Sequence, residues 1–290
     1  MRSNFDVKQE TNKIIQWIKD YFYENGGNGA VLGISGGKDS TIVAKLLVEA
    51  IGKDRVFGVM MPNGKQRDLH DSMKVCEILG ISNTIVNIES TFKAITTAVG
   101  SGLVGLSEQA LVNVPPRLRM TVLYAIAQTR GYRVCGTSNS SEAYVGYCTK
   151  HGDMACDFNP ILNYDTEEVI AIGDYIYGIE FNTNMNSLKV EVNKPEIYRL
   201  IHKIPSDGLC GKTDEDNLGV TYEDINKVIN TGTCENKFAL RAIEDKHKAS
   251  RHKFETTPSV SAKVYYSVDV GKIDGSIITN RINNTINFHS

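Results

Sequence analysis

Apolar and polar positions along the chain follow two alternating periods, which predict short strands separated by helices. Apolar runs typical of buried strands cover residues 30–34, 55–61, 84–88 and 132–136. Apolar side chains recur at helical spacing over residues 5–24, 38–51, 68–79 and 113–131. Another helix is expected from Asp165, where Glu168 completes a capping-box pattern. Strands that alternate with helices predict an α/β fold, a doubly wound parallel sheet with helices on both faces.

The polar and proline positions add boundaries to this pattern. Asn113 is expected to cap the fourth helix, because Pro115 and Pro116 fit only its first turn. Residues 207–217 are polar and contain glycine, so they suggest a mobile loop, and residues 237–251 suggest a polar helix. Residues 259–290 alternate in a way that suggests a terminal hairpin. We expect a single domain over residues 1–262 and a tail of unassigned role over residues 263–290.

The stretch after the first apolar run carries the most chemistry in the chain. It reads Gly33, Ile34, Ser35, Gly36, Gly37, Lys38, Asp39 and Ser40. Glycines let a backbone approach a ligand, and the free N–H groups and dipole of a helix N-terminus attract phosphate. Ser35 and Ser40 add hydroxyl donors, Lys38 adds positive charge, and Asp39 adds a carboxylate for a metal. The stretch therefore predicts an anion pocket.

Three kinds of functional loop are alternative interpretations of this stretch. A fourth alternative is a turn that binds no ligand. The Walker A spacing G-x-x-x-x-G-K requires a glycine where the chain has Leu32. Residues 33–37 do satisfy the G-x-S-x-G nucleophile elbow of serine hydrolases. The third interpretation is the pyrophosphate loop of the N-type ATP pyrophosphatases, whose Ser-Gly-Gly-x-Asp-Ser pattern matches residues 35–40.

A second polar stretch follows the fourth predicted strand, so it belongs at the same edge of the sheet as the first. Thr137 lies at the strand exit and suits a nucleotide sugar or phosphate. Glu142 and Asp39 could hold Mg²⁺ together with water and phosphate oxygens. Glu142 could equally be a carboxylate that interacts with a helix dipole. Lys150 and Asp157 could equally form a surface pair.

Composition narrows the classes of protein. The chain has 290 residues, 41% hydrophobic and 23% charged, which is ordinary for a globular protein. Its net charge of −2 gives no electrostatic argument for binding to nucleic acid or to an acidic membrane surface. No apolar run is long enough to span a bilayer. The six cysteines form no C-x-x-C pair, which argues against zinc and fits reduced thiols in the cytoplasm.

Several motifs together resemble one family, the ammonia-dependent NAD synthetases, across about residues 10–258. Residues 113–120 match its Asn-x-x-x-Arg-x-Arg-Met pattern, and the run from Gly136 to Pro160 is also similar. Further similar segments lie downstream, at residues 205–209, 213–216, 218–222 and 250–253. The resemblance implies a Rossmann-like ATP pyrophosphatase fold of the adenine nucleotide alpha-hydrolase-like type. It also implies a ligase that makes NAD from deamido-NAD, ATP and ammonia through an adenylated carboxylate, releasing AMP and pyrophosphate.

The resemblance implies roles for individual residues. Residues 33–40, Thr137 and Ser206 would contact ATP, and Asp39 and Glu142 would bind Mg²⁺. Deamido-NAD would be held by Arg117, Lys150, Asp157, His252 and Lys253 in a homodimer whose dinucleotide site spans both subunits. Lys38, Asp39 and Asp153 are the expected catalytic residues, with Asp153 or Asp157 as the base that accepts a proton from ammonium.

This sequence departs from the family pattern at a few positions. Ser138 and Asn139 stand where many bacterial members have Asp and His, and Thr166 stands where several have a lysine that contacts ATP. Residues 154–156 replace a smaller, glycine-rich stretch.

Three other functions remain as alternatives. One is an ATP pyrophosphatase with another carboxylate or carbonyl acceptor, and a second is a non-catalytic ATP sensor. The third is a serine hydrolase, for which Asp214 and His252 stand in a suitable order after Ser35.

Overall fold

The computed structural model describes residues 1–66, 69–102, 105–184, 189–203 and 213–254. Its centre is a parallel sheet of four strands in the order β3-β2-β1-β4. The strands are β1 (Ala30–Gly33), β2 (Val56–Met60), β3 (Ser82–Ile85) and β4 (Arg133–Val134). Ala30 is paired with Val56 on one side and with Arg133 on the other, so β1 is a central strand.

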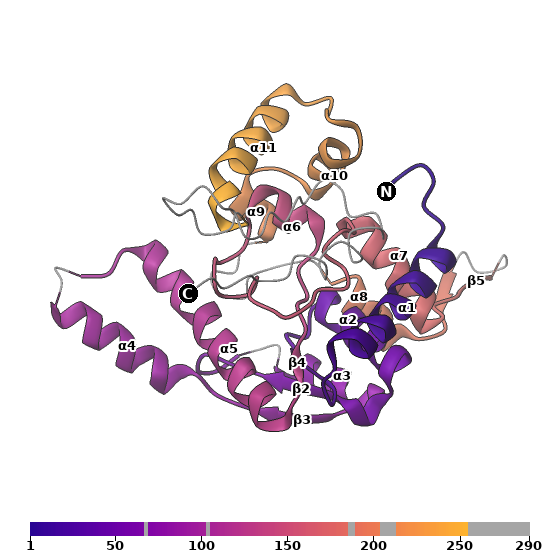
Figure 1. The fold of residues 1–290 in the computed structure, drawn as a ribbon. Coiled ribbons are helices and arrows are strands. Elements are labelled where there is room, and N and C mark those ends of the chain that lie inside the picture. Colours follow the sequence, from indigo (N-terminus) through magenta and orange to yellow (C-terminus); the bar gives the residue numbers. More distant parts are fainter. Residues whose placement is uncertain (67–68, 103–104, 185–188, 204–212, 255–290) are drawn as a thin grey trace, which may run out of the picture.

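Helices cover both faces of this sheet (Figure 1). Alternate β1 side chains enter different cores: Leu32 packs in the larger one with helices α1, α2, α7 and α8, and Val31 packs in the one beneath α5. The bounds are α1 Val7–Asn25, α2 Lys38–Ile51, α3 Leu69–Leu79, α4 Glu89–Gly102, α5 Glu108–Arg130, α7 Thr166–Tyr177 and α8 Pro195–Ile201. The predicted doubly wound parallel α/β fold is therefore confirmed.

A separate cluster of helices lies at the edge where β4 ends (Figure 1). It contains α6 (Ser140–Val145), α9 (Asp214–Leu218), α10 (Tyr222–Thr231) and α11 (Lys237–Ser250), followed by the 3₁₀ turn η2 (Arg251–Lys253). Its own apolar core includes Ile225 and Ile243, both fully buried. Because α6 follows the carboxyl end of β4, this cluster brings side chains over the loops that leave the sheet.

The start of α5 corrects a prediction. The helix begins after Ser107, whose hydroxyl accepts a hydrogen bond from the Ala110 amide, and not after Asn113. Pro115 and Pro116 therefore lie inside the helix, where they remove two backbone donors. Pro115 is buried, so packing offsets part of that cost. The Asn113 side chain instead accepts a hydrogen bond from Thr149 at 2.8 Å.

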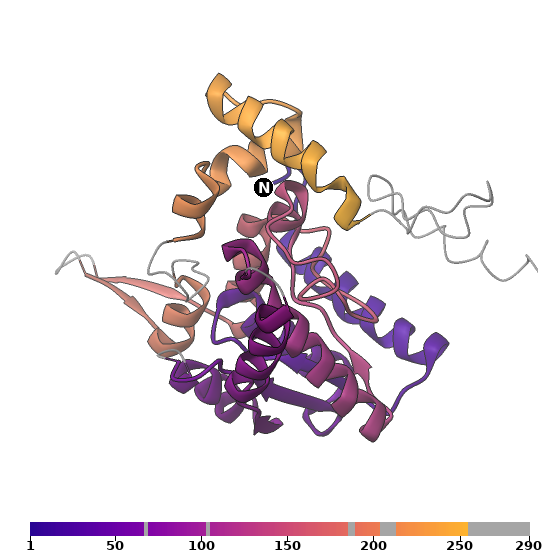
Figure 2. The ribbon, with the colours of Figure 1, turned by 90° about the vertical axis from the view of Figure 1, so that its left-hand side faces the viewer.

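Several elements were absent from the sequence prediction. Helices α4, α8, α9 and α10 are among them. Also absent was an antiparallel hairpin, β5 (Phe181–Asn184) with β6 (Lys189–Val192), which extends away from the sheet (Figure 2). The third strand also begins earlier than predicted, at Ser82. The expected tail hairpin and residues 207–212 of the expected loop lie outside the described residues, whereas residues 214–217 of that loop belong to helix α9. No helix of the described residues has the length and apolar character that crossing a membrane requires.

Candidate active site

The loop between β1 and α2 is held by its own hydroxyl groups. The Ser35 amide donates to Ser40 Oγ at 3.2 Å, and the Gly37 amide donates to Ser35 Oγ at 3.2 Å. Gly37 is the N-cap of α2 and has no side chain to cap the helix, so the first turn keeps amides available for an anion. This arrangement makes the loop a candidate cradle for phosphate oxygens.

Gly36 is required by both backbone conformation and space. Its φ is +78°, a value that other residues rarely adopt. A Cβ atom on Gly36 would lie 2.9 Å from the Asp71 Cβ and 3.0 Å from the Ser72 amide nitrogen. The loop therefore packs directly against the first turn of α3.

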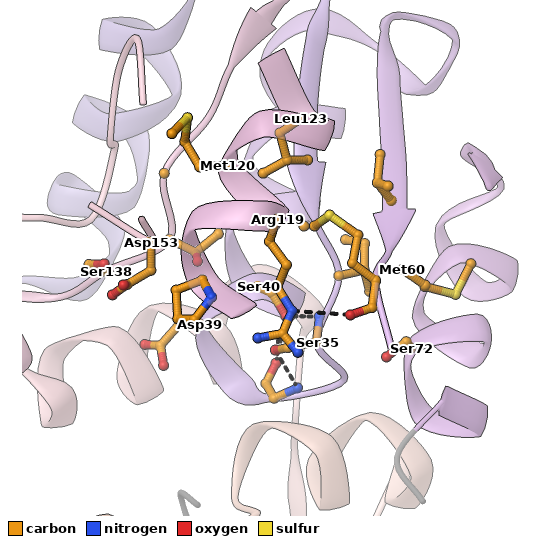
Figure 3. A pocket seen from close by; sticks show the side chains of 18 of the residues that line it. Ser35, Asp39, Ser40, Met60, Ser72, Arg119, Met120, Leu123, Ser138 and Asp153 are labelled. Carbon is orange, nitrogen blue, oxygen red and sulfur yellow. Dashed lines mark hydrogen bonds between the residues drawn. The ribbon is translucent and has the colours of Figure 1, made fainter. Parts of the chain in front are cut away.

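The second polar loop meets the first, as the parallel topology predicts. Asn139 caps α6 by accepting from the Glu142 amide, and its Nδ2 donates to Asp39 Oδ1 at 3.2 Å. Asp39 and Glu142 both line a cavity of about 390 Å³. The cavity walls also include Gly33, Ile34, Ser35, Gly37, Lys38, Ser40, Thr137 and Asp153. Figure 3 shows several of these side chains around the opening.

Charge is concentrated on one side of this cavity. Lys38 Nζ lies 2.7 Å from Asp39 Oδ2 and is buried. Burial lowers the pKa of Lys38, but the charges of Asp39, Glu142 and Asp214 outweigh that effect, and the pKa is raised. The Glu142 carboxyl is desolvated and faces the negative charge of Asp39, which together raise its pKa to about 8.

The repelling carboxylates suit a divalent cation. Binding Mg²⁺ between Asp39 and Glu142 would replace the repulsion that raises the pKa of Glu142. Among the described residues no group of three or more histidine, cysteine, aspartate or glutamate side chains could chelate a metal. Two carboxylates completed by phosphate and water oxygens are a usual arrangement for Mg²⁺.

The residues expected to hold a dinucleotide form a separate group near η2, outside the cavity wall. Arg117 Nε donates to the Lys150 carbonyl at 3.3 Å, and Lys150 Nζ donates to the His252 carbonyl at 2.5 Å. Lys253 Nζ donates to the carbonyl oxygens of Gly146 and Cys148, both at 2.7 Å. Arg117, Lys150 and the adjacent pair His252 and Lys253 thus come from three segments far apart in the sequence.

Asp157 lies apart from that group. Its carboxylate accepts from the Val134 amide at 2.7 Å and from the Tyr124 hydroxyl at 3.2 Å, which anchors it beside β4. Ser206 lies outside the described residues.

Three charged cavity residues were not assigned to the nucleotide site from the sequence: Arg119, Lys203 and Asp214. Arg119 lies inside the matched pattern at 113–120, and Asp214 lies in the segment 213–216, so both carried a signal. Asp214 accepts from the hydroxyls of Tyr147 and Tyr222 beside Lys38. Lys203 had no sequence signal, because only the fold brings the end of α8 to this cavity.

The geometry argues against a serine hydrolase. Ser35 Oγ contacts the Ser40 hydroxyl at 3.0 Å and the Gly37 amide, and no histidine lies beside it among the described residues. A nucleophilic serine requires a neighbouring base. The parallel sheet, the cradle after its first strand and the carboxylates beside it define an ATP pyrophosphatase of the pyrophosphate-loop class.

The comparisons with known proteins identify the family within that class. The model of the NAD synthase family matches residues 10–268, so the chain belongs to this family. The NH(3)-dependent NAD(+) synthetase of Pyrococcus horikoshii is 37% identical over 219 residues, which are 75% of this chain and 77% of that protein. The synthetase of the same name from Archaeoglobus fulgidus is 34% identical over 262 residues, 88% of this chain and 96% of that protein.

A solved structure gives the same picture. The NMN synthetase from Francisella tularensis superimposes with a TM-score of 0.77 at 30% identity. The match covers 89% of this chain and all of that one.

Proposed function

We propose that this protein is an ammonia-dependent ligase that converts deamido-NAD to NAD and cleaves ATP to AMP and pyrophosphate. The observation that carries the proposal is that the loop of residues 35–40, which includes Asp39, lines one cavity together with the Glu142 carboxylate. The relatives in Pyrococcus and Archaeoglobus bear the name of this activity and match most of the chain.

The chemistry requires an activated acyl group, because a carboxylate resists attack by ammonia. The nicotinate carboxylate attacks the α-phosphorus of ATP, which forms an acyl adenylate and expels pyrophosphate. The hydroxyls of Ser35 and Ser40 and the amides at the start of α2 stabilise the leaving pyrophosphate. Bound Mg²⁺, held by Asp39 and Glu142, would offset charge on the phosphates. Ammonia then attacks the adenylate, and AMP leaves.

A proton must leave ammonium before it can attack, and Asp153 is proposed to accept it. Asp153 lines the cavity, and its carboxylate accepts from the Thr149 amide at 2.7 Å. Desolvation raises the pKa of Asp153, although the Thr149 amide opposes this effect. A raised pKa makes the carboxylate a stronger base.

The group near η2 and Asp157, which lies apart from it beside β4, are proposed to hold the dinucleotide. Arg117 and Lys150 are cationic and lie close to His252 and Lys253, which suits a pyrophosphate-bearing ligand. Thr137, which lines the cavity, and Ser206 are proposed to contact ATP.

A homodimer is proposed on the basis of an unpartnered apolar surface. We call it the α4–α5 face, and it is formed by Ile95, Val99, Leu111 and Val112, each 37–44% exposed. No α4 side chain is buried, and α4 with the start of α5 extends away from the sheet (Figure 1). Arg117 lies on the same long helix, so a second copy docked here would approach the proposed dinucleotide site.

The cytoplasm is the proposed location. Five cysteines lie in the described residues, and all of them are free: Cys76, Cys135, Cys148, Cys156 and Cys234. Reduced thiols are typical of that compartment.

A shorter acceptor is a second candidate substrate. The observation that favours it is the likeness to the NMN synthetase from Francisella tularensis, whose whole length is covered. That name implies amidation of nicotinate mononucleotide, which has the same reacting carboxylate without the adenylate half.

A competition experiment tests the proposal and separates the two acceptors. Purified protein receives ATP, Mg²⁺, ¹⁵N-ammonium and equimolar deamido-NAD and nicotinate mononucleotide. The proposal expects ¹⁵N in NAD and a kcat/KM for deamido-NAD at least about tenfold higher than that for nicotinate mononucleotide. A tenfold ratio corresponds to a difference of about 1.4 kcal/mol in activation free energy. Label confined to NMN would assign the second function. A parallel reaction with glutamine in place of ammonium tests the nitrogen donor.

A further inference from the structure

Arg119 projects from α5 into the cavity, opposite the phosphate cradle. The cavity wall contains Arg119 together with Ser35, Ser40 and Asp153. Figure 3 shows the guanidinium group extending from α5 toward the side of the cavity where Ser35 and Ser40 lie. The residue is half-buried, and it lines the cavity.

Most of the hydrogen-bonding capacity of Arg119 is unused. Its Nε donates to the Met61 carbonyl at 3.1 Å, which fixes the side chain against the end of β2. A guanidinium has five N–H donors, and this is the one hydrogen bond Arg119 makes within the described part of the chain. Its remaining N–H groups are therefore available to a ligand.

The other cations of the cavity differ in this respect. Lys38 Nζ lies 2.7 Å from Asp39, and Lys203 Nζ lies 3.1 Å from Asp71. Arg119 forms no ion pair with a described residue, although the negative charge of Asp153 acts on it from a distance. Arg119 is thus the cavity cation whose charge no carboxylate neutralises at close range.

Helix geometry separates the roles of Arg119 and Arg117. Two residues along a helix correspond to a rotation of about 200°, so the two side chains leave α5 in nearly opposite directions. Arg117 is exposed and joins the group near η2, whereas Arg119 faces the cavity.

We propose that Arg119 is a catalytic residue of the adenylation step, whose guanidinium donates hydrogen bonds to the α-phosphoryl oxygens and to the attacking carboxylate. This inference rests on the proposed function. In the step, the carboxylate oxygen forms a bond to the α-phosphorus, and the bond to the bridging oxygen breaks. The electron pair leaves with pyrophosphate, and no proton moves.

The electrostatics of this step explain the need for such a group. Two anions, a carboxylate and a triphosphate, must approach to bonding distance, and Coulomb repulsion opposes them. A planar guanidinium can donate to both at once and keeps its charge at all working pH values. A lysine at this position would offer a charge without the paired geometry.

The test is the exchange of labelled pyrophosphate into ATP with deamido-NAD present and ammonia absent, which measures adenylation alone. For Arg119→Ala we expect the maximal exchange rate to fall about 10²–10³-fold, as for loss of a donor to a developing oxyanion. Arg119→Lys should recover only part of that loss. Millimolar guanidinium ion should restore activity to Arg119→Ala, which a purely structural role would not allow.

Arg130 provides a matched control on the same helix. Its guanidinium lies 3.9 Å from the centre of the Phe57 ring and does not line the cavity. Arg130→Ala should lower the melting temperature and leave the exchange rate within about twofold.

Other outcomes would overturn the assignment. An Arg119→Ala exchange rate within about threefold of wild type would exclude a catalytic role, as would a higher KM for ATP at unchanged maximal rate. Absence of exchange in the wild-type protein would contradict the proposed function and this inference together. An active wild type with an unaffected variant would contradict the role of Arg119 alone.

Discussion

Asp39 is the residue on which the two loops of the cavity converge. One carboxylate oxygen lies 2.7 Å from Lys38 Nζ, and the other accepts from Asn139 Nδ2 at 3.2 Å. An amide in place of the carboxylate keeps the size of the side chain but removes its charge. This substitution at Asp39 therefore distinguishes a role in chemistry from a role in folding.

The first prediction concerns Asp39→Asn. We expect NAD formation to fall by about 10²-fold or more, because the proposed ligand for Mg²⁺ and the partner of Lys38 are lost. The melting temperature should change by no more than about 4 °C. The measurement is steady-state turnover together with thermal unfolding, and near-normal turnover would remove Asp39 as a metal ligand.

The second prediction uses the titration of Glu142. Its pKa of about 8 in the folded protein lies above its ordinary value of 4.5, so folding disfavours the ionised form. The stability of the ligand-free protein should therefore decrease as the pH rises from about 4.5 to 8, and the full penalty should remain above pH 8. Glu142→Gln removes this penalty, and the melting temperature at pH 8.5 should exceed that of wild type by about 2–4 °C for each 1 kcal/mol gained.

Glu235→Gln serves as the control for the second prediction, because Glu235 is exposed on the loop before α11. Its melting curve should follow that of wild type at every pH. A Glu142→Gln protein that is no more stable than wild type at pH 8.5 would contradict the charge arrangement described for the cavity.

The third prediction concerns Lys150, whose ammonium group lies beside η2 and not in the cavity wall. Lys150→Ala should raise the KM for deamido-NAD about tenfold, the loss of one charge-assisted hydrogen bond, and change the KM for ATP less than twofold. Steady-state kinetics with each substrate varied in turn measures both constants. An equal effect on the two would argue against a dinucleotide site at Lys150.

At the scale of elements, the α4–α5 face accounts for the proposed dimer. The fourth prediction is that Val99→Glu, which places a charge on this apolar face, converts the proposed dimer to a monomer at micromolar concentration. Sedimentation velocity measures the change. Phe238→Glu is the control, since Phe238 is 90% exposed on α11 and far from that face in the sequence. A wild-type protein that is already monomeric would refute the proposed interface.

The elements that the sequence predicted well are those with a strong local signal. The phosphate loop, the strands beside it and the capping box at Asp165 were located because glycines, apolar runs and cap residues act over a few positions. The predicted start of α5 was wrong because the preference of proline for the first turn of a helix is statistical, and tertiary packing of Pro115 overrode it. Helix α4 gave a weak pattern because it buries no side chain in the single chain.

The site residues also divide into those that the sequence could predict and those that only tertiary packing determines. The approach of Asp39 to the Asn139 loop followed from parallel topology, which brings the carboxyl ends of strands to one edge. The position of Lys203 could not be predicted, because α8 reaches the cavity only through packing against α2 and α7. The pKa of Glu142 also depends on burial and on charges from two other segments, at Lys38 and Asp39 and at Asp214.

At the scale of the whole molecule, three parts meet at one cavity. The sheet supplies the phosphate cradle, α5 supplies Arg119, and the C-terminal helix cluster brings Asp214 and Tyr222 against Lys38. The group near η2 adds a cationic surface outside the cavity.

The most direct measurement is product analysis with ATP, Mg²⁺, deamido-NAD and ammonium chloride. The account predicts NAD, AMP and pyrophosphate in equal amounts, with no ADP or phosphate. ATP cleavage to AMP without NAD would retain the pyrophosphatase chemistry but contradict the acceptor. No cleavage of ATP under these conditions would contradict the central claim that the cavity is the active site of an amide-forming ligase.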